Sequence, residues 1–350
     1  MTSPVLPPLS VHDLITVPSG GTTQGALADA KRLVDAADRL GYKRYWVAEH
    51  HNFDFVTSNT PSVILANLGA GTTQIRLGSG GVMLPNHTPF VVAEQFSLLN
   101  AMFPGRIDLG LGRAPGTDPI TAAAVRGEMT NRSVEQFPEH VLEILGHLGD
   151  LRPEHEEEYF RRLKPIPQKD AINSDELRPE VWMLGSSLYG AELAGKLGLP
   201  YSFANHFSMG ANPVSPVDHY RRHFQPSARW PKPYVLMSAS AIVADTMEEA
   251  RHLAMPSRVA QYQIRARKVG PVLSPDEAED FAKRTVDQDL FGRIRGTQHL
   301  GPAEKVAREL AELAEKTGAD ELLLAATTHD VQTRIDTLEA LAPYLPNESH

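Results

Sequence analysis

Residues 75–84 read Ile-Arg-Leu-Gly-Ser-Gly-Gly-Val-Met-Leu, an apolar stretch that predicts a buried β-strand with three glycines in its middle. Two similar stretches lie on either side of it, at 44–48 and 106–111, and amphipathic helical patterns fill the intervals. A further strand is predicted at 9–14, so the strand starts at 9, 44, 75 and 106 are separated by 35, 31 and 31 residues. This spacing is typical of βα units, in which a right-handed crossover joins parallel strands.

The same alternation resumes after a polar, proline-bearing stretch and continues to the end of the chain. Four more strands are predicted at 181–184, 200–204, 234–243 and 321–325. Helices are predicted at 24–40, 61–71, 89–102, 134–149, 187–197, 246–267, 302–317 and 329–342. Eight strands and about eight helices favour an α/β fold of the (β/α)8 TIM-like barrel type over an open doubly wound sheet. We expect one domain over 1–350, with insertions near 112–135, 150–180 and 268–300.

The composition of the 350 residues excludes several classes of protein. Hydrophobic residues make up 41% and charged residues 22%, a balance that allows a large core. The net charge of -9 argues against nucleic-acid and membrane-surface partners, because both carry negative charge. The absence of cysteine removes disulfides, thiolate metal sites and cysteine nucleophiles. Since no signal-peptide pattern and no apolar run of about 20 residues is present, we expect a cytoplasmic protein.

The strand predicted at 44–48 continues into Glu49, His50 and His51. Neighbouring residues of an extended chain point to opposite faces, so we expect the two histidines to have different roles. A neutral imidazole is suited to acid–base catalysis near neutral pH, and we expect the Glu49 carboxylate to orient it. The alternative is a hydrogen-bonded loop pair without a chemical role. No metal site is expected, because we find no further cluster of histidine and aspartate with helical ligand spacing.

The glycine-rich middle of the 75–84 strand contains Ser79, Gly80 and Gly81. Glycines weaken a buried strand, and they usually mark a bulge or a close approach of the backbone to a ligand. A flat ring lying on the strand would explain why side chains are missing there. The alternative is a bulge that fits the curvature of the barrel.

A second glycine-rich stretch, Gly-Leu-Gly-Arg-Ala-Pro-Gly at 110–116, follows the strand at 106–111. Its spacing is GxGxxxG, and neither the helix nor the acidic residue of a dinucleotide-binding motif follows, so we reject that interpretation. Arg113 is instead predicted to bind an anion, because a guanidinium makes paired hydrogen bonds with phosphate.

Gly185, Ser186 and Ser187 follow the strand at 181–184, at the start of the helix predicted at 187–197. Free N–H groups, the helix dipole and two hydroxyls meet at such a position, which favours an anion. The alternative is ordinary capping of the helix by Ser186 or Ser187. With Arg113 at the same end of the barrel, we favour phosphate.

These stretches resemble the bacterial luciferase-like flavin monooxygenase family. The similar segments are 40–51, 75–85, 89–95, 104–113 and 185–200. They cover the N-terminal third of the chain densely and the rest to about residue 205 in pieces, whereas the last 140 or so residues agree mainly as a βα pattern. The EHH, GSGG and GR…GLGR sequences occur in the order that the family has, which makes the resemblance specific.

The resemblance implies a TIM-like barrel with insertions that binds reduced flavin mononucleotide (FMN) at the C-terminal ends of its strands. His50 matches the catalytic histidine of the family. Gly80 and Gly81 match a non-proline cis peptide bond beneath the isoalloxazine ring.

The resemblance also implies how the flavin phosphate is held. Arg113 and Ser186 match its ligands, and Tyr189 stands in place of a hydroxyl-bearing neighbour. Gly185 occupies the position of a carboxylate in the catalytic subunit of luciferase, a departure that argues against light production. The longer similarity is to the single-chain oxidoreductase branch of the family.

We therefore predict a flavin-dependent oxidoreductase, and specifically an FMN-using monooxygenase that oxidises a small organic substrate with O2 and reduced flavin. Without a dinucleotide motif, a separate flavin reductase is the expected partner. Two alternatives remain open: a deazaflavin-dependent hydride-transfer enzyme, and a flavin-binding protein without turnover, against which the paired histidines argue. We expect a homodimer, because helices 61–71 and 89–102 are apolar on more than one face and match the helices that pair in the family.

Overall fold

The computed structural model describes residues 4–127, 132–151, 158–163, 165, 178–207, 212–266, 269–284, 288–294 and 298–346. Its strands are β1 (Leu9–Asp13), β2 (Arg44–Val47), β3 (Arg76–Met83), β4 (Ile107–Gly112), β5 (Glu180–Gly185), β6 (Tyr201–Phe203), β7 (Val235–Val243), β8 (Gln298–Gly301) and β9 (Glu321–Leu324). The longer helices are α1 (Thr23–Arg39), α2 (Pro61–Gly69), α3 (Pro89–Met102), α6 (Phe137–Leu148), α9 (Leu188–Leu197), α10 (Val214–His223), α12 (Met255–Ala266), α13 (Pro275–Arg284), α15 (Ala303–Thr317) and α16 (Val331–Leu341). Shorter helices are α4 (Pro119–Arg126), α5 (Arg132–Glu135), α7 (Glu158–Arg162), α11 (Met247–Leu253), α14 (Gln288–Arg293), η1 (Leu84–Asn86), η4 (Asn205–Phe207) and η6 (Ala342–Tyr344).

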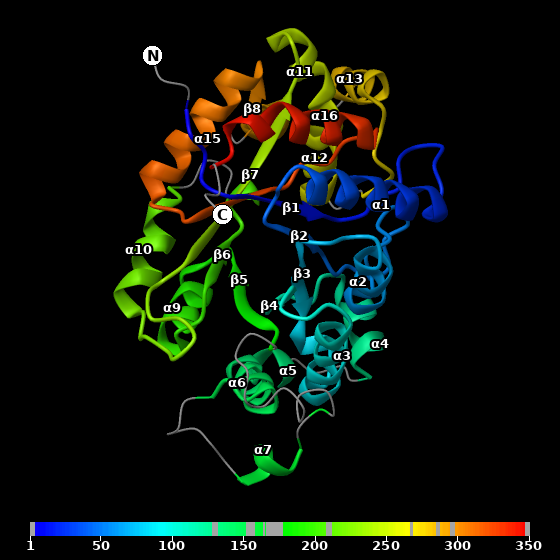
Figure 1. The fold of residues 1–350 in the computed structure, drawn as a ribbon. Coiled ribbons are helices and arrows are strands. Elements are labelled where there is room, and N and C mark those ends of the chain that lie inside the picture. Colours follow the sequence, from blue (N-terminus) through cyan, green and yellow to red (C-terminus); the bar gives the residue numbers. More distant parts are fainter. Residues whose placement is uncertain are drawn as a thin grey trace.

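Eight strands close into a parallel barrel, as the βα spacing predicts. The order is β1-β2-β3-β4-β5-β6-β7-β9, and β9 pairs again with β1. The helices lie around the outside of the strands (Figure 1). None of the helices in the described part of the chain is both long enough and apolar enough to span a membrane.

The segment 268–300 contains more regular structure than the predicted polar insertion. It holds α13 and α14, and it ends in β8, which pairs in parallel with the second half of β7 outside the closed barrel. This ninth strand was not predicted, because four residues reading Gln-His-Leu-Gly show no strand pattern. The helix predicted at 246–267 is divided into α11 and α12.

Two other predictions about helices need correction. α10 was not predicted, since only Val217 and Tyr220 of its ten residues are buried and its apolar period is therefore weak. The 112–135 insertion, expected as a loop, contains α4 and α5. The 150–180 insertion contains α7, and most of its other residues lie outside the described part of the chain.

The interior of the barrel is filled in layers, from the strand starts to the strand ends. At the strand starts, Arg44, Asp108 and Glu321 form buried ion pairs. Above them is a separate apolar cluster of Trp46, Trp182, Leu236 and Leu323. The two indoles pack edge to face, with their ring centroids 5.2 Å apart. The ion pairs and the indoles fill this end of the barrel, and a cavity lies at the C-terminal strand ends.

On the outside, α2 and α3 pack side by side and expose large apolar side chains. The apolar pattern of 89–102 predicts buried side chains at Val91, Phe96, Leu98, Leu99 and Met102, but Val91, Leu98 and Met102 of α3 are 45%, 51% and 51% exposed. Phe96 and Leu99 are buried as predicted. The helix has apolar residues on both faces, and only one face can meet the barrel.

Candidate active site

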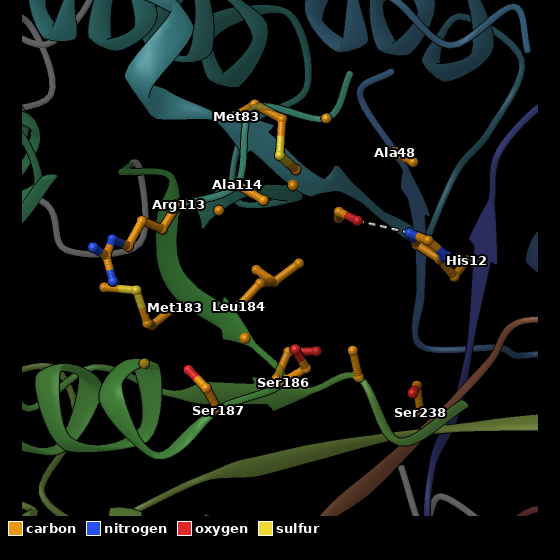
Figure 2. Close-up of a pocket in the computed structure, with 18 of the residues that line it drawn as sticks. His12, Ala48, Met83, Arg113, Ala114, Met183, Leu184, Ser186, Ser187 and Ser238 are labelled. Carbon is orange, nitrogen blue, oxygen red and sulfur yellow. Dashed lines mark hydrogen bonds between the residues drawn. The ribbon is translucent and has the colours of Figure 1, made fainter. Parts of the chain in front are cut away.

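A cavity of about 510 Å³ opens at the C-terminal ends of the strands (Figure 2). This is the size of an ordinary small-molecule site. Its walls are mostly apolar. The sequence-predicted residues that line it are His50, Gly80, Gly81, Arg113, Gly185, Ser186, Ser187 and Tyr189. Residues from four separate stretches of the sequence are thus brought to one cavity, whereas the side chains of Ser79, Glu49 and His51 do not line it.

One end of the cavity brings together a cation, hydroxyl groups and the N-terminus of a helix. The Arg113 guanidinium lies 4.4 Å from the centre of the Tyr189 ring and makes no ion pair with any residue of the described chain. Ser187 is the N-cap of α9, but its side chain makes no capping hydrogen bond, so the capping alternative is not realised for Ser187. Figure 2 shows the Ser187 hydroxyl pointing toward the side of the cavity where Arg113 lies. A cation, hydroxyls and a helix N-terminus are together the donor set that phosphate requires.

The neighbours that would prevent a side chain differ from one glycine of β3 to the next. A Cβ at Gly78 would lie 2.6 Å from the Trp46 indole nitrogen, so Gly78 makes room for the indole and not for a ligand. A Cβ at Gly81 would lie 2.7 Å from the Gly110 carbonyl oxygen. The register with β4 shifts between Gly80 and Val82, which is the bulge of the alternative interpretation. The Gly80–Gly81 peptide bond is cis, as the resemblance implies, and it lies at the cavity wall.

Ser79 is fully buried on the other face of β3. Its hydroxyl lies 3.0 Å from both the backbone nitrogen and the carbonyl oxygen of Gly110 on β4. The side chain therefore joins two strands and does not reach the cavity.

His50 lies at the cavity with a defined hydrogen bond. Its Nδ1 is 3.0 Å from the carbonyl oxygen of Gly116, so Nδ1 carries the hydrogen and Nε2 is the basic nitrogen. Burial lowers the pKa of His50, and this outweighs the opposing effects of the Gly116 hydrogen bond and the Glu49 charge. A neutral imidazole at the cavity is suited to accept a proton.

Glu49 orients one imidazole of the pair, but this is His51 and not His50. Its fully buried carboxylate accepts hydrogen bonds of 2.7 Å from His51 Nε2 and 2.7 Å from His87 Nε2, and one of 3.0 Å from the backbone N–H of Met83. Burial alone would raise the pKa of Glu49, but the hydrogen bonds from the two imidazoles lower it to about 2. This group joins the loop after β2 to the loop after β3 behind the cavity wall. Glu49 meets His51 and not His50 because alternate residues of an extended chain share a face.

Two further histidines line the cavity and were not predicted. His12, inside β1, places Nε2 2.7 Å from the Gly80 carbonyl oxygen (Figure 2), and His206 places Nδ1 2.6 Å from the Ser238 hydroxyl. Burial lowers the pKa of His12 to about 4 and that of His206 to about 3. Both are therefore neutral at physiological pH. The signals that could have found them are the inward alternation of β1 and the position of His206 just after β6.

This barrel and its cavity match one family over most of the chain. Residues 8–321 match the family model of the luciferase-like monooxygenases. A luciferase-like monooxygenase of Escherichia coli is 37% identical, over 94% of both chains. The N-acetyl-S-alkylcysteine monooxygenase of Bacillus subtilis is 34% identical, over 87% of this chain and 88% of that one. The chain belongs to the luciferase-like monooxygenase family, and it is an enzyme of that family.

Solved structures share the fold of this chain. The apo form of MsnO8 superposes with a TM-score of 0.84 at 30% identity, over 97% of each chain. The oxygenating component of 3,6-diketocamphane monooxygenase from Pseudomonas putida, in complex with FMN, has a TM-score of 0.67 at 16% identity, over 97% of this chain and 99% of that one. A secondary alcohol dehydrogenase in complex with an F420–acetone adduct has the same TM-score and identity, over 98% of this chain and 100% of that one. The fold thus accommodates flavin-type cofactors of both kinds.

Proposed function

We propose that the chain is an FMN-dependent monooxygenase that binds reduced flavin in the cavity and oxidises a small organic substrate with O2. The observation that carries the proposal is the set of phosphate donors at one end of an otherwise apolar cavity. When bound, the reduced flavin supplies the electrons with which O2 is activated. The residues of this chain then have three tasks: to hold the phosphate, to exclude water and to move a proton.

Arg113, Ser186 and Ser187 would hold the phosphate. The guanidinium supplies paired N–H donors, the two hydroxyls add donors, and the first N–H groups of α9 complete the set. Tyr189 keeps the guanidinium in place by stacking. The Gly80–Gly81 segment leaves a wall without side chains on which a flat ring can lie.

His50 would act on the proton. Its Nε2 is the basic nitrogen, and the apolar walls, including Met83, Met183 and Leu184, exclude water from the reacting atoms. The buried imidazoles of His12 and His206 add hydrogen-bonding groups without charge. The thioether substrates in the name of the B. subtilis relative are the first compounds to test.

The deazaflavin alternative differs in phosphate recognition and in its use of oxygen. Purified protein should be titrated with FMN, reduced FMN and deazaflavin, and oxygen uptake should be followed with the bound cofactor. We expect the tightest binding for reduced FMN and substrate-dependent oxygen uptake. Tight deazaflavin binding without oxygen uptake would favour the hydride-transfer alternative, and binding without any turnover would favour a flavin-binding protein.

Arg113→Ala is expected to weaken FMN binding by one to two decades in Kd. The variant removes a charge-assisted hydrogen bond worth about 1.5–3 kcal/mol, and about 1.4 kcal/mol of binding free energy corresponds to one decade in Kd. Fluorescence titrations with FMN and with riboflavin measure the effect, because riboflavin lacks the phosphate and should bind the variant almost normally. Arg308→Ala, on the exposed face of α15, is the matched control. An equal loss for both flavins would mean that Arg113 contacts the ring or supports the fold.

We also propose a cytoplasmic homodimer that receives reduced FMN from a separate reductase. Val63 of α2 and Val91, Leu98 and Met102 of α3 form an exposed apolar surface, which is typical of an interface. Leu98→Glu is expected to convert the dimer to a monomer in light scattering at micromolar concentration. Val5→Glu, at an exposed position outside these helices, should leave the dimer intact. A wild-type monomer would contradict the proposal.

A further inference from the structure

A group of two imidazoles and a carboxylate lies between α9 and α10, outside the cavity. His219 and His223 are four residues apart on α10 and therefore share one face of the helix, and Glu192 of α9 faces them. The potential ligand atoms of the three side chains all lie within 4.8 Å of one another. We propose that this group binds a zinc ion, with Glu192, His219 and His223 as its ligands.

The spacing of the group already matches a zinc shell. His219 Nε2 lies 3.3 Å from Glu192 Oε2. Tetrahedral zinc with bonds of about 2.0–2.1 Å places neighbouring ligand atoms roughly 3.3 Å apart. The two imidazole centroids are 4.4 Å apart with the rings tilted by 43°, so His223 reaches the same place as His219.

The tautomer of His223 is set for binding a metal. Its Nδ1 lies 2.8 Å from the backbone carbonyl oxygen of His219, and only an N–H can donate to that oxygen. The proton is therefore on Nδ1, and Nε2 presents a lone pair. Histidines that bind zinc usually have such a partner on the other ring nitrogen, which fixes the orientation of the ring.

The ligand types favour zinc over the abundant hard cations. Two imidazole nitrogens and one carboxylate oxygen are ligands that bind zinc and related transition ions, whereas magnesium and calcium prefer oxygen alone. Lys196 lies 2.6 Å from the other oxygen of Glu192. Its charge opposes a cation, so we expect Lys196 to weaken binding without preventing it.

A second group with the same residue types, Glu49, His51 and His87, has a different geometry. Both imidazoles have Nε2 at 2.7 Å from the same oxygen of Glu49. These are hydrogen bonds from two N–H groups, and their distances are shorter than the ligand separation in a zinc shell. This second group is therefore a hydrogen-bonded network, and it serves as the control for the first.

The proposed ion would join two packed helices. α9 and α10 lie side by side (Figure 1), and none of the three ligands lines the cavity. Since the N-terminus of α9 carries Ser187, zinc would also stabilise the helix that we assign to phosphate binding. The zinc site does not depend on the proposed function, because it can be measured without flavin.

Metal-free full-length protein with its affinity tag removed should be titrated with Zn²⁺ by calorimetry, and with Co²⁺ by visible absorption. We expect one equivalent of Zn²⁺ to bind per chain and the Tm to rise with zinc. The visible spectrum of the Co²⁺ form should be that of a cobalt ion with a low coordination number. His219→Ala and His223→Ala should each weaken zinc binding at least about 100-fold, because even partners of a ligand are worth about 10–100-fold. Lys196→Met should tighten zinc binding about threefold, since removing an exposed positive charge near a cation has only a small effect on its affinity.

The control variant His51→Ala/His87→Ala should keep the single zinc equivalent and its affinity. Thermal unfolding without metal checks that each variant folds, and the partly exposed positions of the α10 histidines make this the expected result. Absence of saturable zinc binding would overturn the proposal. Binding that survives both α10 variants, or that is lost only in the control variant, would overturn it as well.

Discussion

His50→Ala is expected to reduce turnover at least about 100-fold while the Kd for FMN changes by no more than about threefold. The imidazole lines the cavity, and its Nδ1–H is committed to the Gly116 carbonyl, so the variant removes the basic Nε2 and no phosphate donor. Two measurements are needed: flavin affinity by titration, and the rate of reduced-flavin oxidation that depends on substrate. Loss of FMN binding in the variant would contradict the assigned role.

The pH dependence of the same reaction gives an independent test. Because burial lowers the pKa of His50, its neutral form persists to more acidic pH than an exposed imidazole would allow. The fall in kcat/KM on the acidic side of its pH profile is therefore expected below about pH 6.5, the ordinary pKa of histidine. An acidic limb above this value would mean that another group titrates.

His51→Ala is the matched control for His50→Ala. It removes one of the hydrogen bonds that hold the Glu49 carboxylate, so we expect lower stability and less than a tenfold change in rate. If His51→Ala is inactive while His50→Ala turns over normally, the two roles are exchanged. If neither variant affects the rate, the pair is only a hydrogen-bonded feature of the loop.

The barrel could be predicted from the sequence because its strands are buried on both faces. A strand such as β4, with all six residues buried, forms an apolar run that stands out from its helical neighbours. β8 is short and polar, and α10 buries only two side chains, so neither leaves a pattern that a local window detects. Elements at the edge of a fold depend on tertiary contacts for their formation.

The candidate site was predictable where it follows strand ends and not where it lies within a strand. Arg113 and Ser186 were found because residues just after barrel strands face the site. His12 was missed because a histidine inside an apolar strand suggests nothing about its neighbours, and only the closed barrel brings it to Gly80. His219 and His223 were missed although their spacing of four residues is visible in the sequence, because α10 itself was not predicted. The expectation that no cluster has helical ligand spacing was therefore wrong.

The charges at the strand starts were passed over by sequence analysis, yet they carry the largest expected effect on stability. Asp108 is fully buried, and its carboxylate accepts hydrogen bonds from the guanidinium groups of Arg44 and Arg76 and from the indole of Trp46. Burial would raise the pKa of Asp108, but the two guanidinium groups outweigh this and lower it. Glu321 binds the opposite side of Arg44 through two hydrogen bonds. The network closes the lower end of the barrel beneath the two tryptophans.

Asp108→Ala is expected to lower the free energy of unfolding by about 3–5 kcal/mol, because it leaves the buried guanidinium of Arg44 without one of its partners. Urea unfolding at neutral pH measures the loss, and Asp336→Ala, at an exposed position on α16, should change stability by less than about 0.5 kcal/mol.

The lowered pKa of Asp108 sets the sign of the pH dependence of this stability. The contribution of Asp108 is fully present above the unfolded carboxyl pKa of about 4 and is lost as pH falls through the lower folded value. The difference between wild type and Asp108→Ala should therefore be constant from pH 6 to 7 or so and shrink in strong acid. A loss of less than about 1 kcal/mol at neutral pH would mean that Glu321, Glu180 and water satisfy Arg44 without Asp108.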